Sequence, residues 1–491
     1  QMPDKRDLVI YELHVRDFVQ SRSIKEVQSK LDYLQKLGVN AVELMPINEF
    51  EGNSSWGYNP SFYFAADKMY GTDYDYKAFV NECHQRGMAV ILDMVLNHAY
   101  GQCPFVQMYF ANGKPAGNNP WFNTTSPNPV YSWGYDFNHE SGATKKLVNQ
   151  VVRHWLDEYH FDGFRFDFTK GFTNTPGEGH GYDLPRINIL KRIHDEMQEI
   201  KPGSLMVCEH LADNSEEKIL ANHGILLWGN MNHNYLEASM GYLPGSDLSW
   251  GSYQARGWSQ PHLIAYMESH DEERMMFKNL SFGNQSTDGA YSSKHVPTAL
   301  DRSALAASFF FTIPGPKMLW QFGELGYDVS INQIQKGGEV CECHRIAEKP
   351  IFWNYYDQGD RRGLYLAYAR LIELKTKYPV FRTADFTLQV GNSAVKTITL
   401  RSPGHDVVVV GNFGMTATTY ELNFTQDGTW QRYLSPEPLV VNNKKATLNL
   451  APGEYRIYST VTLQTEASRG RHYPHRARGR HGLSHLPQSG P

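Results

Sequence analysis

The sequence predicts an α/β protein: a (β/α)8 TIM barrel with a short insertion after its third strand, followed by a C-terminal antiparallel β-sandwich. Through residues 1–380, hydrophobic strand-like runs alternate with segments of helical spacing. In residues 381–461 the period changes, and short runs rich in β-branched and aromatic residues alternate with Gly, Pro, Asn and Asp turns. At 491 residues the chain is long enough for a large core and a second, smaller domain.

Eight hydrophobic runs in the first domain have the length and composition of buried strands. They occupy residues 8–13, 39–45, 89–95, 163–167, 205–209, 225–228, 263–268 and 318–322. Helical crossovers connect parallel strands, so eight such units indicate a closed barrel rather than an open sheet. Six strands are expected in the second domain, at residues 395–401, 406–412, 418–423, 430–434, 446–450 and 454–459.

Helix signals lie between the strands of the first domain. The first helix is expected to begin at a capping box, Ser23-Ile24-Lys25-Glu26, and to end at Gly38. Further helices are expected at residues 75–86 and 187–200. A last helix follows the eighth strand and carries Leu364, Tyr368, Leu371 and Leu374 on one face.

Two segments break the alternation. Residues 98–141 follow the third strand and are rich in Gly, Pro, Asn and aromatic residues; an irregular insertion of this length is usually functional. Residues 462–491 are rich in Arg, His, Gly and Pro and have no apolar periodicity, which predicts a disordered basic tail. Such a tail could bind an anionic surface or be dispensable.

Composition restricts the classes of function. The net charge of -5 argues against a nucleic-acid surface, and no stretch reaches the ~18–20 apolar residues of a membrane span. The 29 Tyr, 25 Phe and 10 Trp are compatible with stacking on sugars and equally with an ordinary large core. A neutral or sugar-like substrate is easier to accommodate than a polyanion. We expect no organic cofactor and a monomeric protein.

The five cysteines are too few and too oddly spaced for a disulfide framework. The run Cys341-Glu342-Cys343-His344 could suggest a metal site, but it lacks a second ligand pair, so an ordinary loop is expected.

Four of the predicted strands end in charged or hydrogen-bonding residues. The four segments are DMVLNH (residues 93–98), GFRFD (163–167), VCE (207–209) and MESHD (267–271). Buried Asp and Glu are costly unless they are paired or functional. Four such strand ends in order therefore indicate one site at the carboxyl end of the barrel.

These strand ends supply acids with different surroundings. Side chains alternate along a barrel strand, so Arg165 and Asp167 both point inward, and the cation favours an ionised Asp167 that could attack a sugar carbon. Apolar neighbours should make Glu209 resist ionisation, so it could donate a proton; the alternative is a buried ion pair with Arg or Lys. Asp271 could stabilise positive charge in an oxocarbenium-like transition state. Two histidines and three acids could in principle bind a metal. The sequence has no H-x-H or H-E-x-x-H spacing that would support such a site.

In this order, on the third, fourth, fifth and seventh strands, the four segments closely resemble the signature regions of the α-amylase family of glycoside hydrolases, family 13, over roughly residues 8–460. The resemblance implies that Asp167 is the nucleophile, Glu209 the general acid/base and Asp271 the transition-state stabiliser. It also implies a set of substrate-binding residues: Trp56, Tyr58, His98, Arg165, Lys170, His210 and His270. Of these, Tyr58 belongs to the W-G-Y-N-P segment that resembles the family's aromatic platform.

The activity implied by the resemblance is a retaining α-amylase that cleaves internal α-1,4 bonds of starch, glycogen or maltooligosaccharides by double displacement. Lys170 lies where amylases place a lysine. Residues 55–60, by contrast, look more like those of branching, debranching and trehalose-releasing members, so a branching, debranching or transglycosylating enzyme on the same α-glucans is the alternative. A third hypothesis is a glucan-binding protein without catalysis. No signal peptide is found, but an extracellular or periplasmic location is expected, because polymer-degrading amylases are usually exported.

The resemblance also bears on calcium. Many α-amylases hold Ca²⁺ through the Asn of the first segment, an Asp of the insertion, and a His carbonyl directly after the Lys of the second segment. The corresponding residues are Asn97, Asp136 and Gly171, which stands where the His would be. A backbone carbonyl needs no particular side chain, so a calcium site stays possible.

Overall fold

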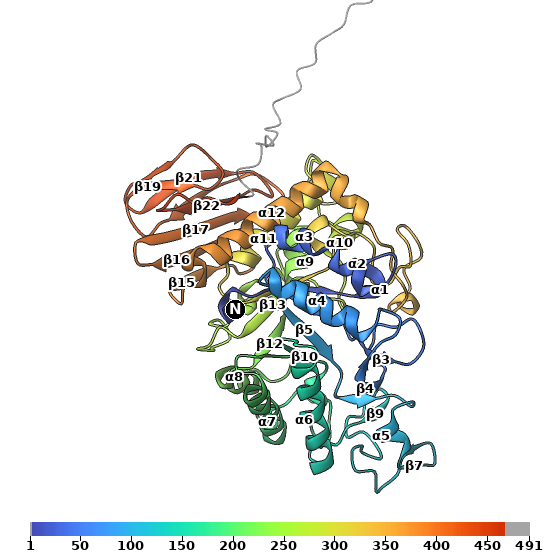
Figure 1. Cartoon of the computed structure of the whole chain (residues 1–491). Coiled ribbons are helices and arrows are strands. Elements are labelled where there is room, and N and C mark those ends of the chain that lie inside the picture. Colours follow the sequence, from blue (N-terminus) through green and yellow to red (C-terminus); the bar gives the residue numbers. More distant parts are fainter. Residues whose placement is uncertain (1, 467–491) are drawn as a thin grey trace, which may run out of the picture.

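The computed structural model describes residues 2–466 of the chain (Figure 1). Eight parallel strands form a closed barrel in the order β1-β14-β13-β12-β11-β10-β5-β2. Their bounds are β1 Val9–Leu13, β2 Ala41–Leu44, β5 Ala89–Met94, β10 Gly163–Phe166, β11 Leu205–Cys208, β12 Leu226–Asn230, β13 Leu263–Tyr266 and β14 Lys317–Trp320. The predicted barrel and its eight strands are confirmed. Most of the predicted basic tail, residues 467–491, lies outside the described residues.

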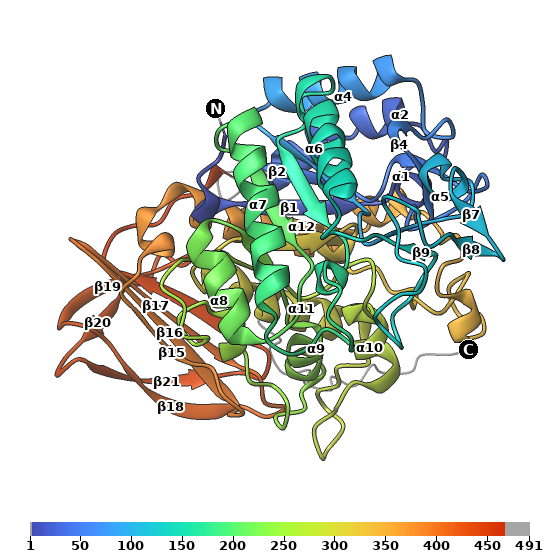
Figure 2. The same ribbon diagram turned by 90° about the horizontal axis from the view of Figure 1, so that it is seen from below.

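Helices surround the barrel. Their bounds are α1 Val15–Phe18, α2 Ile24–Gln28, α3 Leu31–Leu37, α4 Asp73–Gln85, α6 Gly142–Asp157, α7 Leu184–Ile200, α8 Asn214–His223, α9 Asn232–Met240, α10 Met275–Phe282, α11 Val296–Thr312 and α12 Gly359–Lys377. Figure 2 shows α6, α7 and α8 side by side on one flank. In α6, Leu147, Val151 and Trp155 recur at helical spacing and are buried. Burial of this apolar stripe against the sheet stabilises the helix.

The first predicted helix is wrong in detail. Ser23 Oγ accepts a bond from Lys25 N at 3.2 Å, but the Glu26 carboxylate accepts from Ser21 N at 2.8 Å, so the reciprocal capping box does not form. The helix also breaks into α2 and α3, and at the break the Ser29 hydroxyl donates to the Glu26 carbonyl at 2.6 Å. Such a side-chain bond competes with helical backbone bonds. The predicted stop is confirmed, since Gly38 ends α3 in a left-handed conformation.

The predicted insertion after the third barrel strand is present, between β5 and α6. It contains β6 His98–Ala99, α5 Pro104–Gln107, β7 Phe110–Ala111, β8 Lys114–Pro115 and β9 Tyr135–Asp136. β6 pairs with β9, and Phe122 stacks on Phe137 with ring centroids 4.2 Å apart. Figure 1 shows the insertion beside the hairpin of β3 Asn48–Phe50 and β4 Pro60–Ala66. Residues from both segments therefore overhang the same end of the barrel.

The C-terminal domain is the predicted antiparallel β-sandwich. Its larger sheet contains, in spatial order, β15 Phe386–Gln389, β16 Val395–Ser402, β17 His405–Asn412, β22 Tyr455–Ser459, β19 Gly428–Arg432 and β20 Leu439–Val441. β18 Thr418–Asn423 pairs with β21 Lys445–Leu450 in the second sheet. Val408, Val410, Trp430, Leu448 and Tyr458 form the core between them. β15 and β20 were not predicted, because both are short and half exposed.

The sandwich packs against α11 through a close backbone approach (Figure 1). A Cβ on Gly411 of β17 would lie 2.7 Å from Phe309 of α11, so only glycine fits there. Phe309 also contacts Phe413, with ring centroids 5.1 Å apart, and Arg302 donates to the Phe413 carbonyl at 2.6 Å. This interface is built from both apolar packing and a buried arginine.

In the loop that follows β14, Cys341 and Cys343 form a disulfide. This bond was not predicted from the sequence, because a separation of two residues matches no framework pattern. Two joined sulfurs are not thiolate ligands, so the metal interpretation of this run does not apply. Among residues 2–466, no helix has the length and apolar character that crossing a bilayer requires.

Candidate active site

The four predicted segments meet at the carboxyl end of the barrel, around the guanidinium of Arg165. This side chain is fully buried and lies over the Trp228 ring at 4.1 Å. Its Nη1 donates to Asp93 Oδ1 at 2.9 Å and to Asp167 Oδ1 at 3.0 Å. Its Nη2 lies 2.8 Å from Glu209 Oε2, as an ion pair. Because β5, β10 and β11 are neighbours in the barrel, three strands deliver carboxylates to one cation.

Asp167 and Glu209 are largely buried and share one cation, Arg165. Burial raises the pKa of Glu209 to about 7 against the opposing charge of Arg165, and the carboxylates of Asp167 and Asp271 raise it further. Burial also raises the pKa of Asp167, again opposed by Arg165. Both carboxyls are paired with Arg165, at 3.0 Å for Asp167 Oδ1 and 2.8 Å for Glu209 Oε2. The backbone N–H of Phe168 donates to Glu209 Oε2 at 3.0 Å and fixes its orientation.

His270 is held as a cation against two aromatic rings, those of Trp56 and Tyr58, which together form an aromatic wall. Its Nδ1 pairs with a carboxylate oxygen of Glu12. Burial alone would lower its pKa, but the charge and hydrogen bond of Glu12 outweigh burial and raise it to about 9. Tyr58 stacks on the imidazole with centroids 5.1 Å apart, Trp56 meets it edge-on at 5.3 Å, and the Tyr58 hydroxyl donates to Asp93 at 2.6 Å. The predicted aromatic segment thus lies against the predicted acids.

Asp271 is the most exposed of the three predicted catalytic acids. Its side chain is 43% exposed, against 14% for Asp167 and 18% for Glu209. Burial would raise its pKa, but the charges of His270 and Arg345 outweigh burial and lower it. Asp271 is therefore ionised under conditions in which Glu209 holds its proton.

The remaining predicted substrate-binding residues lie at different depths. His98 is buried, with Nε2 2.8 Å from the Tyr58 carbonyl oxygen, and burial lowers its pKa to about 4. His210 is fully buried, with Nδ1 2.8 Å from Thr169 Oγ1 and Nε2 2.7 Å from Glu216 Oε2. A sugar could contact His210 only by displacing one of these partners.

Lys170 lies nearer the surface than either histidine. It is half-buried, and its Nζ lies 5.6 Å from the Phe168 ring and 5.9 Å from the Tyr131 ring. Tyr131 and its neighbour Trp133 belong to the insertion. Trp133 is 45% exposed and contacts Phe168 and His98, with centroids 5.1 and 6.1 Å away. Sequence reasoning missed both aromatics, because the insertion has no periodicity that marks inward-facing positions.

Sequence reasoning also missed two acids on the first two barrel strands. Glu12 and Glu43 are register partners on β1 and β2, and both are fully buried. Neither carboxyl oxygen of Glu43 has a hydrogen-bond partner within residues 2–466. Burial, together with the nearby charges of Glu12 and Asp93, raises the pKa of Glu43 well above its ordinary value. The sequence did contain a signal for these two acids, because each is a glutamate inside an otherwise hydrophobic predicted strand.

The three predicted calcium ligands line one cavity beside the active site. Asn97 Oδ1 is buried and lacks a hydrogen-bond partner among the described residues. A Cβ on Gly171 would lie only 1.8 Å from that oxygen, so the residue after Lys170 must be small here. Burial raises the pKa of Asp136 to about 7, while Asn123 donates to it at 2.8 Å. An orphaned amide oxygen and a buried carboxyl are oxygen donors of the kind that Ca²⁺ takes.

Comparison with known proteins agrees with this geometry. The family model described as alpha amylase, catalytic domain, matches residues 22–133 and 130–366. The malto-oligosyltrehalose trehalohydrolase of Arthrobacter ramosus is 24% identical over 452 residues, which cover 76% of this chain and 72% of that protein. The pullulanase of Bacillus subtilis (strain 168) is 32% identical over 444 residues, covering 77% of this chain and 57% of that protein. The chain spans 28%, 72% and 42% of the first three curated relatives it matches.

Solved structures share the fold. The crystal structure of an Anoxybacillus alpha-amylase superposes with a TM-score of 0.71 and 18% identity, covering 94% of this chain and 99% of that one. At this identity the similarity concerns the arrangement of the barrel and the sandwich.

The Glu12–His270 pair generates the first prediction. In the wild-type protein the His270 ring should titrate at about 9. In Glu12→Gln its pKa should fall toward the ordinary histidine value of about 6.5 or below, because burial then acts without the opposing carboxylate. Imidazole NMR titration measures both values, with Glu421→Gln in the exposed β18 as the matched control. A His270 pKa that stays near 9 in Glu12→Gln would contradict this assignment.

Proposed function

This chain belongs to the α-amylase family of glycoside hydrolases, and we propose that it cleaves internal α-1,4-glucosidic bonds of starch, glycogen or maltooligosaccharides with retention of configuration. The observation that carries the proposal is the meeting of Asp167, Glu209 and Asp271 around Arg165 and His270 at the barrel mouth. Burial raises the pKa of Asp167 and of Glu209, whereas His270 and Arg345 lower the pKa of Asp271. Glu209 can therefore keep its proton where Asp271 is ionised, and such a difference divides acid and charge-stabilising roles in carbohydrate chemistry.

In the first step, an Asp167 carboxylate oxygen attacks the anomeric carbon of the sugar. The glycosidic C–O bond breaks, and its electron pair goes to the leaving oxygen, which takes the proton of Glu209. Positive charge develops on the sugar ring in the transition state. Asp271 faces that charge as a carboxylate, and His270 and the Tyr58 platform would hold the ring.

In the second step, Glu209 acts as a base. Its carboxylate takes a proton from a water molecule, the water oxygen attacks the anomeric carbon, and the ester bond to Asp167 breaks. Asp167 is released as a carboxylate and Glu209 is protonated again. Two inversions leave the product with the configuration of the substrate.

A debranching activity on α-1,6 bonds of the same glucans is the second candidate. It is favoured by the 32% identity to a pullulanase over 77% of this chain, the highest identity among the long matches reported above. The chemistry of the acids would be the same for both bonds. The aromatic residues around the cleft, among them Trp56 and Trp133, would decide which linkage reaches Glu209.

Product analysis separates the two candidates. On amylose, which has only α-1,4 bonds, the wild-type protein should release new reducing ends. Asp167→Ala should lose at least about 10³-fold in rate, because the covalent step then has no nucleophile. Asp157→Asn, at the exposed end of α6, is the control and should retain the wild-type rate. No release from amylose together with release from pullulan would favour the debranching enzyme, and no release from either would contradict glycoside hydrolysis.

Activity should fall as pH rises through about 7, the pKa of Glu209. Glu209 must be protonated to donate, and its raised pKa keeps the proton on only below that value. The acid limb reports ionisation of the two acids that must be charged, Asp167 and Asp271. A pH profile of kcat/KM on maltoheptaose measures both limbs. An alkaline limb several pH units above 7, or a profile without limbs, would contradict the assignment of Glu209 as the general acid.

We further propose that Asn97, Asp136 and the Gly171 carbonyl hold a Ca²⁺ ion, which would tie the insertion to the second segment. Calcium in excess over its dissociation constant should stabilise the protein by about 2–4 kcal/mol, so a chelator should lower Tm and added calcium restore it. Asp136→Asn should lose this response, while Asp288→Asn in an exposed turn should keep it. Equal Tm values with chelator and with calcium in the wild-type protein would contradict the site.

A further inference from the structure

An arginine from the loop after the eighth barrel strand reaches the predicted transition-state stabiliser. Arg345 Nη2 donates to Asp271 Oδ1 at 2.7 Å and to the Asp271 carbonyl oxygen at 2.5 Å. The Arg345 side chain is 35% exposed. The Asp271 side chain is 43% exposed, so the contact lies at the exposed mouth of the barrel and not in its interior.

The residues around Arg345 form a turn, residues 344–349, that a lysine holds. Lys349 Nζ donates to the carbonyls of His344 at 2.7 Å, Ala347 at 2.9 Å and Arg345 at 3.2 Å. Half-burial lowers the pKa of Lys349 to about 8. Because backbone carbonyls on both sides of Arg345 are bonded to one ammonium group, the backbone that carries Arg345 has a fixed shape.

A second cation anchors the same turn to helix α1, which follows the first barrel strand. Arg16, in α1 directly after β1, donates from Nη2 to the carbonyls of Ile346 at 3.2 Å and Ala347 at 3.1 Å. Asp17 fixes that guanidinium through two bonds of 2.9 Å. Both Arg16 and Asp17 are buried. A buried ion pair of this geometry positions its partners firmly.

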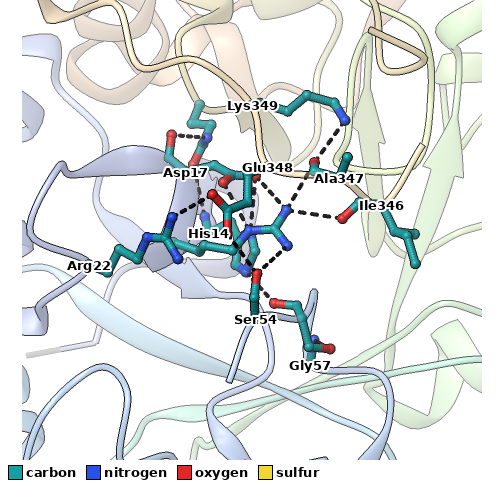
Figure 3. Close-up of polar contacts among 12 residues, drawn as sticks. His14, Asp17, Arg22, Ser54, Gly57, Ile346, Ala347, Glu348 and Lys349 are labelled. Carbon is teal, nitrogen blue, oxygen red and sulfur yellow. Dashed lines mark hydrogen bonds and ion pairs between the residues drawn. The ribbon is translucent and has the colours of Figure 1, made fainter. Parts of the chain in front are cut away.

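A third contact links the turn to the aromatic segment. Figure 3 shows Glu348 between Ser54 and Arg22. The Ser54 hydroxyl donates to Glu348 Oε1 at 3.0 Å, and Ser54 stands two residues before Trp56. The turn that carries Arg345 and the segment that carries the aromatic wall are thus joined outside the cleft.

We propose that Arg345 is a positioning residue, which aims the Asp271 carboxylate at the sugar from a turn clamped by Lys349 and Arg16. This inference rests on the proposed function and deepens it. With Oδ1 held by Arg345, the Oδ2 oxygen of Asp271 is left to face the sugar. An acid that must meet developing positive charge gains from such fixed orientation.

The charge around Asp271 comes from several elements. The charged and titratable groups that interact with it are its two chain neighbours His270 and Glu272, Arg165 of β10, Glu209 after β11, and Arg345. His270 and the two arginines favour the ionised form of Asp271, and the two glutamates oppose it when ionised. Arg345 is the cation of this set that hydrogen bonds the Asp271 side chain, so its loss should raise the Asp271 pKa.

Kinetics of Arg345 variants test the proposal. Arg345→Ala should lower kcat on maltoheptaose by about 10- to 100-fold with little change in KM, because the interaction matters in the transition state. Its acid limb should move to higher pH, since Asp271 then protonates more easily. Arg345→Lys keeps the charge and should return the acid limb to its wild-type position, with part of the rate.

Arg153→Ala, on the exposed face of α6, makes the same chemical change away from the cleft and should behave as wild type. An Arg345→Ala enzyme with kcat within about twofold of wild type and an unmoved acid limb would overturn the proposal. A reduced kcat that Arg345→Lys does not recover, with an unmoved acid limb, would also overturn it, because a merely structural role predicts that pattern.

A second measurement needs no substrate. Carboxyl ¹³C NMR, with the signal assigned by Asp271→Asn, should show a higher Asp271 pKa in Arg345→Ala than in wild type. An unchanged pKa overturns the positioning role even if the enzyme is active. If the wild-type protein cleaves no α-glucan, the proposed function fails alone, and this titration still decides whether Arg345 controls Asp271.

Discussion

The active site depends on one buried guanidinium. Arg165 contacts carboxylates from β5, from the end of β10 and from the end of β11. A buried charge left without its partner typically destabilises a protein by about 3–5 kcal/mol, so this arginine and its carboxylates can be buried only as a set. Three neighbouring strands are therefore joined by side chains at the mouth as well as by their backbone ladders. The geometry of the acids follows from that constraint.

The barrel interior holds more carboxyl groups than cations. Glu12 is paired with His270, and Glu43 lies beside it with its pKa raised well above the ordinary value. Burial drives each acid toward its neutral form, and only a nearby cation keeps one ionised. This competition gives the acids different pKa values. The pKa of Glu209 is raised to about 7, while the pKa of Asp271, beside His270 and Arg345, is lowered.

The acids at the strand ends could be predicted because alternation and strand order are local properties of the sequence. The pairing of Glu12 with His270 could not, because it depends on which strands become neighbours when the barrel closes. The role of Arg345 could not be predicted for a related reason. The carbonyls next to it accept hydrogen bonds from Arg16, which lies about 330 positions earlier in the chain. The capping box predicted at Ser23 is a counterexample. The local motif is present in the sequence, but the Glu26 carboxylate accepts a hydrogen bond from the Ser21 backbone instead of the Ser23 backbone.

The exposed position of Asp271 gives its two cations a particular role. In the free enzyme, water stabilises this carboxylate, because 43% of its side chain is exposed. A bound sugar would remove most of that water, and the loss of solvation alone would favour protonation. Charge–charge interactions strengthen as water leaves, so His270 and Arg345 oppose protonation most strongly in the complex. In the proposed mechanism they would thus keep Asp271 negative at the stage when positive charge develops on the sugar, which is when an ionised carboxylate contributes to the rate.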